Sequence, residues 1–293
     1  MINVDRRIEQ LDIFKTVAQT YQEVAALRMR KVKDYVLRNR EFLHGVSSIF
    51  ARVKLSYDDT IKKLLESQGV TEEEDQSRYI NKMNFTKKNG KTVLVFASAN
   101  TGLYGDIILK VFEYFAKYID STVDLAILGK LGKLWFPQRF PKRNFQYYDL
   151  SDGDPDPEEV SKIMEDLSVY ENVILFHGKF KDVLEQVPQQ SGISGDAVTM
   201  ETLQDMRQIR CIFEPSLEEV FEFFEKEIKS SLFEHALYES ALSKYTSRMV
   251  SLDMAANNAL HSLKKLKLER SLLKHRKANK DKNTVLAGVL YGC

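Results

Sequence analysis

Two long stretches of this 293-residue sequence lack the residues that interrupt helices. No proline occurs before Pro137 and no glycine before Gly45, and neither residue type occurs between Ser216 and Ala287. Because proline and glycine most readily end or kink a helix, both ends of the chain are predicted to be long helices. The second, from about Glu218 to Lys282, would span roughly 90 Å at about 1.5 Å per residue, so most of it must leave the globular body.

Other absences exclude several classes of site. The only two cysteines, Cys211 and Cys293, lie far apart, which suggests neither a zinc site nor a disulfide framework and fits a reducing compartment. The five histidines are dispersed, and no nucleophile elbow occurs. No window approaches the roughly 18 apolar residues of a membrane span, and residues 1–20 are unlike a signal peptide. We expect a chain that is not an enzyme by itself and binds no cofactor or metal.

The balance of charge is even, and the apolar content is sufficient for a core. Lys and Arg total 43, Asp and Glu total 42, and 43% of the residues are hydrophobic. Net charge therefore says nothing about a polyanionic partner, and the distribution of charge along the chain matters more.

Both predicted helices carry the alternating three-and-four spacing of a coiled-coil seam. In the last helix the seam comprises Leu242, Tyr245, Met249, Leu252, Ala256, Ala259, Leu263, Leu266, Arg270 and Leu273. In the first helix it comprises Leu11, Phe14, Ala18, Tyr21, Ala25, Arg28, Val32, Tyr35, Asn39, Phe42, Val46, Ile49 and Val53. Helices at opposite termini pair when a compact middle turns the chain back, so we expect an antiparallel coiled coil.

The middle of the chain alternates between strand and helix patterns. Strands are predicted at 92–97, 123–128, 145–148 and 172–176, helices at about 105–118 and 158–168, and further candidate strands at 196–203 and 208–213. This order predicts an α/β domain with a mostly parallel sheet. The predicted organisation is an N-terminal coiled-coil helix at 1–57, a charged connector at 58–90, the α/β domain at 91–215 and a C-terminal coiled-coil helix at 216–293.

Gly102 and Gly105 follow the first predicted strand, at the position of a phosphate-cradling loop in nucleotide-binding α/β domains. The loop lacks the third glycine of the dinucleotide fingerprint, and no Gly-Lys-Ser/Thr ending occurs in the chain. We therefore interpret these glycines as a tight strand-to-helix turn. A small α/β nucleotide-binding enzyme with helical arms is kept as an alternative.

The last helix ends in a basic run and an apolar tail. The run comprises Lys264, Lys265, Lys267, Arg270, Lys274, Arg276, Lys277, Lys280 and Lys282. In the antiparallel pairing we expect it to lie beside a second basic stretch, Arg28 to Lys33, and facing cations are expected only where something acidic lies nearby. Nucleic acid and an acidic protein surface are both candidates. The tail, Val285 to Tyr291, favours a protein sleeve, because an apolar end is unfavourable in water.

Four stretches, in order along the chain, resemble one family. The block from Arg248 to Ala259 resembles the Arg-Met-Val-Ala-Met-Asp-Asn-Ala-Thr-Lys-Asn-Ala block of the gamma subunit of F-type ATP synthases. Val24 to Arg30 resembles its Val-Ala-Ala-x-Lys-Leu-Arg stretch, and Gly102 to Gly105 resembles its Gly-Leu-Cys-Gly turn. Glu214-Pro215-Ser216 opens the last helix as in that family. The resemblance covers essentially the whole chain.

The resemblance implies a fold, a role and partners. The fold would be an antiparallel coiled coil of the terminal helices with a Rossmann-like domain at its base. The chain would be a shaft that turns inside a ring of alpha and beta subunits and rests on the epsilon subunit and the membrane ring of c subunits. No nucleic acid would be bound. The expected ring and rotor contacts are Arg28, Arg30, Lys31, Arg248, Met249, Asp253, Asn257, Lys264, Lys267, Lys274 and Lys277, with Gly102 and Gly105 as the turn.

The chain also departs from the family's pattern. Tyr21-Gln22-Glu23 replaces the common Met-Lys-Met, Asn100-Thr101 replaces Asp-Arg, and lysine-rich Lys280 to Asn283 replaces Ile-Thr-Gln-Glu. A divergent ring or a machine that mainly hydrolyses ATP is one alternative, and a stand-alone coiled-coil scaffold is another. No paired-cysteine insertion occurs, so the resemblance implies a bacterial protein at the cytoplasmic face of the membrane.

Overall fold

The computed structural model describes residues 2–67, 89–153, 155–193, 214 and 217–292, and its two longest elements are its terminal helices. These are α1 (Ile2–Ser67) and α7 (Leu217–Tyr291). Between them lie β1 (Thr92–Ala97), α3 (Ile107–Ala116), β2 (Asp124–Leu128), α4 (Lys130–Arg139), β3 (Gln146–Tyr148), α5 (Pro157–Leu167), β4 (Asn172–Phe180) and β5 (Gln186–Gly192). In the described ranges no helix combines the length and apolar character needed to cross a membrane.

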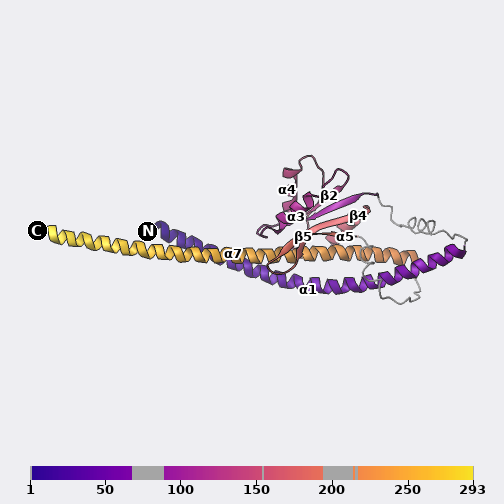
Figure 1. The fold of residues 1–293 in the computed structure, drawn as a ribbon, viewed down its shortest axis with the longest axis horizontal. Coiled ribbons are helices and arrows are strands. Elements are labelled where there is room, and N and C mark those ends of the chain that lie inside the picture. Colours follow the sequence, from indigo (N-terminus) through magenta and orange to yellow (C-terminus); the bar gives the residue numbers. More distant parts are fainter. Residues whose placement is uncertain (1, 68–88, 154, 194–213, 215–216, 293) are drawn as a thin grey trace.

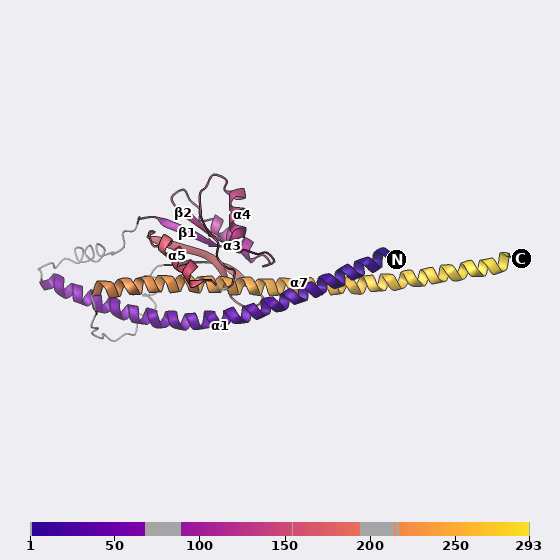
Figure 2. The same ribbon diagram turned by 180° about the vertical axis from the view of Figure 1, so that it is seen from behind.

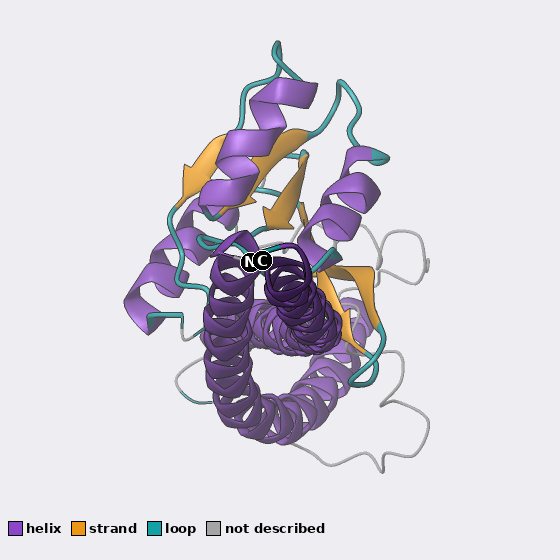
Figure 3. Ribbon diagram, turned by 90° about the vertical axis from the view of Figure 1, so that its left-hand side faces the viewer, coloured by secondary structure: helices purple, strands orange, loops and turns teal. Residues whose placement is uncertain are grey.

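The molecule is a long rod with a small domain on one side. Figure 1 shows α1 and α7 running side by side in opposite directions, with the strands and short helices gathered against the middle of α7. The view from behind, Figure 2, shows the C-terminal end of α7 extending well past the N-terminus of α1. The end-on view in Figure 3 shows the two helices curving around one another below the sheet.

Contacts along the rod fix the pairing of α1 and α7. Arg270 Nη1 lies 3.4 Å from Asp5 Oδ1, and Gln22 Nε2 donates to Asp253 Oδ1 at 3.5 Å. Further along, the rings of Tyr35 and Tyr238 stack with centroids 5.4 Å apart. Partner numbers fall on one helix as they rise on the other. The expected antiparallel coiled coil is therefore confirmed.

The seam predicted for α7 is the seam that the structure shows. Buried side chains within it are Leu242, Tyr245, Leu252, Ala256, Ala259, Leu263 and Leu266, and half-buried ones are Met249, Arg270 and Leu273. Near its middle, Ala18 of α1 packs with Leu252 and Ala256. Small side chains such as Ala18 and Ala256 allow two helices to pack closely.

The seam predicted for α1 is wrong at five positions, where the side chains are exposed: Phe14, Tyr21, Arg28, Phe42 and Ile49. The predicted Tyr35 is half buried and stacks on Tyr238, and the side chain of Val53 lies outside the described residues. Its inward side chains are Val4, Ile8, Leu11, Lys15, Ala18, Gln22, Ala25, Met29, Val32, Val36, Asn39, Leu43 and Val46. Thus Leu11, Ala18, Ala25 and Val32 were placed correctly, whereas the expected Phe14 and Tyr21 are each about half exposed. From Leu11 onward, the spacing between inward residues alternates four and then three, whereas the predicted spacing alternated three and then four. The error arises because Lys15 and Gln22, which are polar, occupy inward positions beside apolar neighbours.

The register of α1 is testable with two adjacent residues. Leu43 is 9% exposed and Phe42 is 51% exposed. We expect Leu43→Ala to lower the free energy of unfolding by about 2 kcal/mol or more, because it removes buried methyl groups and leaves a cavity. We expect Phe42→Ala to cost about 1 kcal/mol or less. Urea unfolding followed by circular dichroism measures both, and a larger loss for Phe42→Ala would contradict the observed register.

The α/β domain contains one five-stranded sheet in the order β3-β2-β1-β4-β5. Strands β1 to β4 are parallel, and β5 pairs antiparallel with β4 at the edge. The expected mostly parallel sheet is confirmed, and β1 has the predicted limits. The sequence patterns predicted neither α4 nor β5, and the β5 segment is largely polar. The candidate strands at 196–203 and 208–213 lie outside the described residues.

The limits of the long helices also differ from expectation. Helix α1 continues past residue 57 to Ser67, into the segment that was predicted to be a connector. Helix α7 extends from Leu217 to Tyr291, beyond the expected end near Lys282. The division into four parts otherwise stays a prediction.

Side chains from α7 complete the core on both faces of the sheet. On one face, Val93 and Val95 of β1 belong to a cluster that includes Phe233 and Leu237 of α7. On the other, Phe96 belongs to a cluster that includes Leu242 and Tyr245 of α7. Because one helix contributes to both clusters, the domain cannot leave the rod without exposing its own core.

His177, on β4, is fully buried and is held as a neutral residue. Its Nδ1 lies 3.2 Å from the carbonyl oxygen of Gly178, and its Nε2 lies 2.8 Å from Ser191 Oγ. A carbonyl can only accept, so the proton is on Nδ1, and Nε2 accepts from the serine. Burial lowers the pKa of His177 to about 4. The residue is structural.

Acid should therefore destabilise the domain through His177. The pKa in the folded state lies below the ordinary value of 6.5, so this contribution to stability is complete above pH 6.5 and is lost as pH falls toward 4. The loss should reach about 3 kcal/mol at most. We expect His177→Gln to reduce the slope of unfolding free energy against pH in this window. Some slope should persist because burial also lowers the pKa of His235. An unchanged slope would contradict the assignment.

Candidate functional site

The candidate site is the junction where α7 crosses the turn that follows β1. Within this turn Leu103 and Gly105 have positive φ values of 66° and 59°. A Cβ atom on Gly105 would lie 2.5 Å from Ser251 Oγ and 2.6 Å from Ser247 Oγ, both on α7. The tight turn predicted for Gly102 and Gly105 is present, and the glycine is needed at 105 for backbone conformation and for close approach to α7.

A nearly buried ion pair lies beside this turn. Asp152, in the loop after β3, and Lys244, on α7, have side chains only 10% and 8% exposed, with Lys244 Nζ 3.6 Å from Asp152 Oδ1. Lys244 also donates to the carbonyl oxygen of Ser98, at 3.1 Å. The pair thus joins the loop after β3, the end of β1 and the long helix.

The Asp152 carboxylate is also held by the β1–α3 turn. Its Oδ1 accepts from the backbone N–H of Asn100 at 2.7 Å, and its Oδ2 accepts from the N–H of Thr101 at 3.0 Å. The hydroxyls of Thr101 and Tyr104 donate to Oδ2 at 2.9 and 3.0 Å. Oδ2 therefore has three donors, and Oδ1 has one besides its ion pair with Lys244, which satisfies the group despite its burial.

Burial and mutual attraction act in opposite directions on the pKa of each member of the pair. Burial alone would raise the pKa of Asp152, but Lys244 and the four donors outweigh it and hold that pKa below its usual value. Burial lowers the pKa of Lys244, and Asp152 opposes this shift. Such a pair adds little net stability over an apolar substitute, but loss of one partner leaves an uncompensated charge. Its main effect is to fix position.

This arrangement disfavours the nucleotide-binding alternative. The N–H groups at the start of a loop after β1 are those that would hold a phosphate in a nucleotide-binding α/β domain. Here the N–H groups of Asn100 and Thr101 bind the chain's own carboxylate. In the described part of the chain, no group of His, Cys, Asp and Glu residues is arranged to hold a metal.

Arg248 lies against the same turn. It donates to the carbonyl oxygen of Gly102 and, at 2.9 Å, to Thr101 Oγ1. Its guanidinium carbon lies 3.8 Å from the centre of the Tyr104 ring, a cation–π contact. The structure thus brings together three of the predicted site residues, Gly102, Gly105 and Arg248. Sequence reasoning missed Asp152 and Lys244, which belong to no local motif.

The other predicted site residues are distributed along the rod. Arg28 reaches Tyr245, with Nη1 3.4 Å from the hydroxyl oxygen, and Lys31 lies over the Tyr35 ring. Met249 is half buried in the seam, and Asn257 donates to Asp253 at 3.1 Å. Exposed cations are Arg30, Lys264, Lys267, Lys274 and Lys277.

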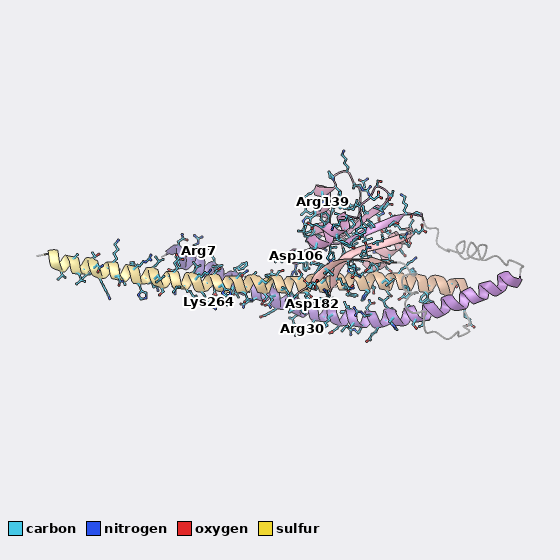
Figure 4. All side chains as sticks on the ribbon, in the orientation of Figure 1. Arg7, Arg30, Asp106, Arg139, Asp182 and Lys264 are labelled. Carbon is cyan, nitrogen blue, oxygen red and sulfur yellow. The ribbon has the colours of Figure 1, made fainter. Side chains whose placement is uncertain are left out.

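The expectation that the two basic stretches face one another is wrong. Arg28 lies beside Tyr245, whereas Arg270 of the basic run lies beside Asp5. Figure 4 shows Arg30 below the α/β domain and Lys264 farther along the rod, toward Arg7. The prediction was wrong because the basic run on α7 begins opposite the N-terminal part of α1 and continues past the end of α1, far from Arg28 to Lys33. No mutual repulsion therefore has to be offset.

The turn offers a matched pair of glycines for a test. Gly105→Ala would force a side chain into the left-handed region and against α7, and we expect a loss of about 2 kcal/mol or more in unfolding free energy. Gly102 has no heavy atom within 4 Å of a built Cβ and no positive φ, so Gly102→Ala should change stability by about 0.5 kcal/mol or less. Equal losses in thermal or urea unfolding would contradict the close approach at Gly105.

Comparisons with known proteins agree on one family. Residues 1–279 match the family model described as ATP synthase. The ATP synthase gamma chain of Ruminococcus albus is 25% identical, over 92% of this chain and 90% of its own length, and that of Pelagibacter ubique is 22% identical, over 98% and 97%. A chain of the central stalk/c-ring structure of Tetrahymena thermophila mitochondrial ATP synthase shares the fold, with a TM-score of 0.55 and 20% identity over 82% of this chain and 99% of that one. This chain belongs to the ATP synthase gamma-chain family, the non-catalytic central rotor subunits of F-type ATP synthases.

Proposed function

We propose that this chain turns inside a ring of alpha and beta subunits and couples its rotation to ATP chemistry at sites on the ring. The observation that carries the proposal is the shape of the rod. From about Lys274 onward, α7 has no partner within the described chain, and its side chains there are exposed. A single unaccompanied helix with apolar Val285, Leu286 and Val289 near its end suits the interior of a surrounding protein.

An off-centre shaft can bias several equivalent sites differently. The α/β domain lies on one side of the coiled coil, and the coiled coil itself is curved (Figure 3). A ring subunit would therefore meet a different surface at each orientation of the shaft. Each catalytic site would change its affinity only as far as its contacts with the shaft differ between orientations.

The partners divide along the rod. We assign the alpha and beta subunits to the part that carries Lys264, Lys267, Lys274 and Lys277, with Arg28, Arg30 and Lys31 nearer the base. Acidic loops of the ring would face these cations. The epsilon subunit and the c-subunit membrane ring would lie at the α/β domain, and the whole complex would sit at the cytoplasmic face of a bacterial membrane. Arg248 donates to the carbonyl oxygen of Gly102, so we assign both residues to the contact between α7 and the α/β domain and not to a partner subunit.

Charge reversal on the basic run tests the proposal. We expect the triple variant Lys267→Glu, Lys274→Glu and Lys277→Glu to lose most of the ATP hydrolysis of a complex reconstituted from this chain with alpha and beta subunits. Each exposed pair contributes about 0.2–1 kcal/mol, so single changes should be mild. The isolated variant should unfold at the wild-type temperature, because these side chains are exposed.

A second triple variant serves as the control. This variant carries Lys117→Glu, Lys142→Glu and Lys162→Glu, which change the net charge by the same amount at exposed positions of the α/β domain. It should leave hydrolysis unchanged.

The isolated wild-type chain should hydrolyse no ATP. Failure of the wild type to assemble with the ring would overturn the proposal. So would tight, salt-sensitive binding of duplex DNA by the isolated chain combined with full activity of the reversed complex.

A further inference from the structure

We propose that Asp152 and Lys244 form a torque joint, a pair of positioning residues that stops the α/β domain from slipping on the shaft when the shaft turns under load. The inference rests on the proposed rotary function and adds to it a specific mechanical site. It concerns transmission of rotation between the base and the coiled coil, not the chemistry on the ring.

Between the large side chains that α7 contributes to the two core clusters, the surface that it presents to the domain is made of small side chains. Its buried residues there include Ala236, Ser240, Ala241, Ser243 and Ser247. Glycines face them closely: a Cβ on Gly178 would lie 2.6 Å from Ser243 Oγ, and one on Gly105 would lie 2.6 Å from Ser247 Oγ. Apolar and van der Waals contact over such a surface is not directional. Close contact alone therefore gives limited resistance to sliding or twisting.

The Asp152–Lys244 pair supplies a directional contact between the helix and the domain. Lys244 projects from the small-residue surface, and its ammonium reaches both Asp152 and the carbonyl oxygen of Ser98 at the end of β1. Asp152 is in turn held by two backbone N–H groups and two hydroxyls of the β1–α3 turn. Rotation of the domain about α7 would separate the two buried charges and break the hydrogen bond from Lys244 to Ser98, whereas the bonds within the domain keep Asp152 in place. Attraction between charges is strongest where water is excluded.

Arg248 extends the joint by one turn of the helix. It donates to Thr101 Oγ1 and to the carbonyl oxygen of Gly102 and lies over Tyr104, so it grips the same turn that holds Asp152. Lys244 and Arg248 are four residues apart and lie on one face of α7. Two cations on the helix thus hold the same part of the domain, Arg248 through the β1–α3 turn and Lys244 through Asp152 and Ser98. The resulting network resists torque about the shaft axis.

The pair can be tested in the whole complex by comparing transport with hydrolysis. In vesicles that contain the assembled enzyme, we expect Lys244→Met to lower the ratio of ATP-driven ion transport to ATP hydrolysis several-fold, while hydrolysis itself continues. Lys244→Arg should restore most of the ratio. The double variant Asp152→Asn with Lys244→Met should fold better than Lys244→Met, because no unpaired charge stays buried, yet should still transport poorly. Lys162→Met, an exposed lysine on α5, is the matched control.

A second measurement reports slippage directly in the isolated full chain. Spin labels at Lys117→Cys and Asn258→Cys, after replacement of the two native cysteines, place one probe on the domain and one on the shaft. We expect the distribution of distances between the two labels to broaden in the double variant and to stay narrow in Lys162→Met.

A wild-type ratio of transport to hydrolysis together with a narrow distance distribution in the double variant would overturn the torque joint. Reduced stability with an unchanged transport ratio would also overturn it, since a merely structural role predicts that result. Failure of the wild type to assemble would instead refute the rotary function.

Discussion

The pairing of α1 with α7 is the interaction on which the rest of the structure depends. Long isolated helices in water are held mainly by packing of an apolar face against a partner. Most of α1 has only α7 as that partner, and α7 in turn uses α1 and the sheet on different stretches. Because the two helices are at opposite ends of the chain, their pairing forces everything between them into a compact excursion. The α/β domain is that excursion, and it is built directly on α7.

The two faces of α7 divide its work. Toward α1 it presents heptad residues such as Leu252 and Leu263, and toward the sheet it presents Phe233, Leu237 and the small residues around Ser243. This explains the nearly continuous burial from Ala236 to Ser247. Beyond Leu273 both partners end, and the helix is exposed on every side. The distribution of burial along α7 therefore marks a clamped middle and a free end.

Local patterns predicted those parts of the fold that local physics determines. The α7 seam was predicted correctly at every position because apolar residues occupy all of it up to Leu266. The limits of β1 were predicted correctly because its residues form an uninterrupted apolar run, as a buried strand requires. The α1 seam was partly wrong, since Gln22 is inward for a reason that lies on the other helix: it bonds Asp253. Strand β5 was missed because it owes its existence to pairing with β4, not to its own side chains.

The candidate site was the hardest part to predict. Gly102, Gly105 and Arg248 could be found from a resemblance, but the two residues that connect them, Asp152 and Lys244, lie far apart in the sequence and carry no motif. A lysine on an otherwise buried stretch of helix is itself the signal that could have been used. Charged side chains are almost never fully buried unless paired, so Lys244 required an acidic partner from the domain.

The misassigned residues of α1 carry a final implication for the proposed role. Phe14 and Tyr21 were expected in the seam because they are large and apolar, and the structure instead leaves them on the outer face of the rod with Ile13, Val17 and Val24. Apolar side chains gathered on an exposed face are unfavourable in water and typical of surfaces that are covered in an assembly. A scaffold that worked alone would gain nothing from that face. A shaft enclosed by a ring would bury part of this face at every orientation. The exposed apolar face of α1 therefore favours the rotor over the stand-alone coiled coil.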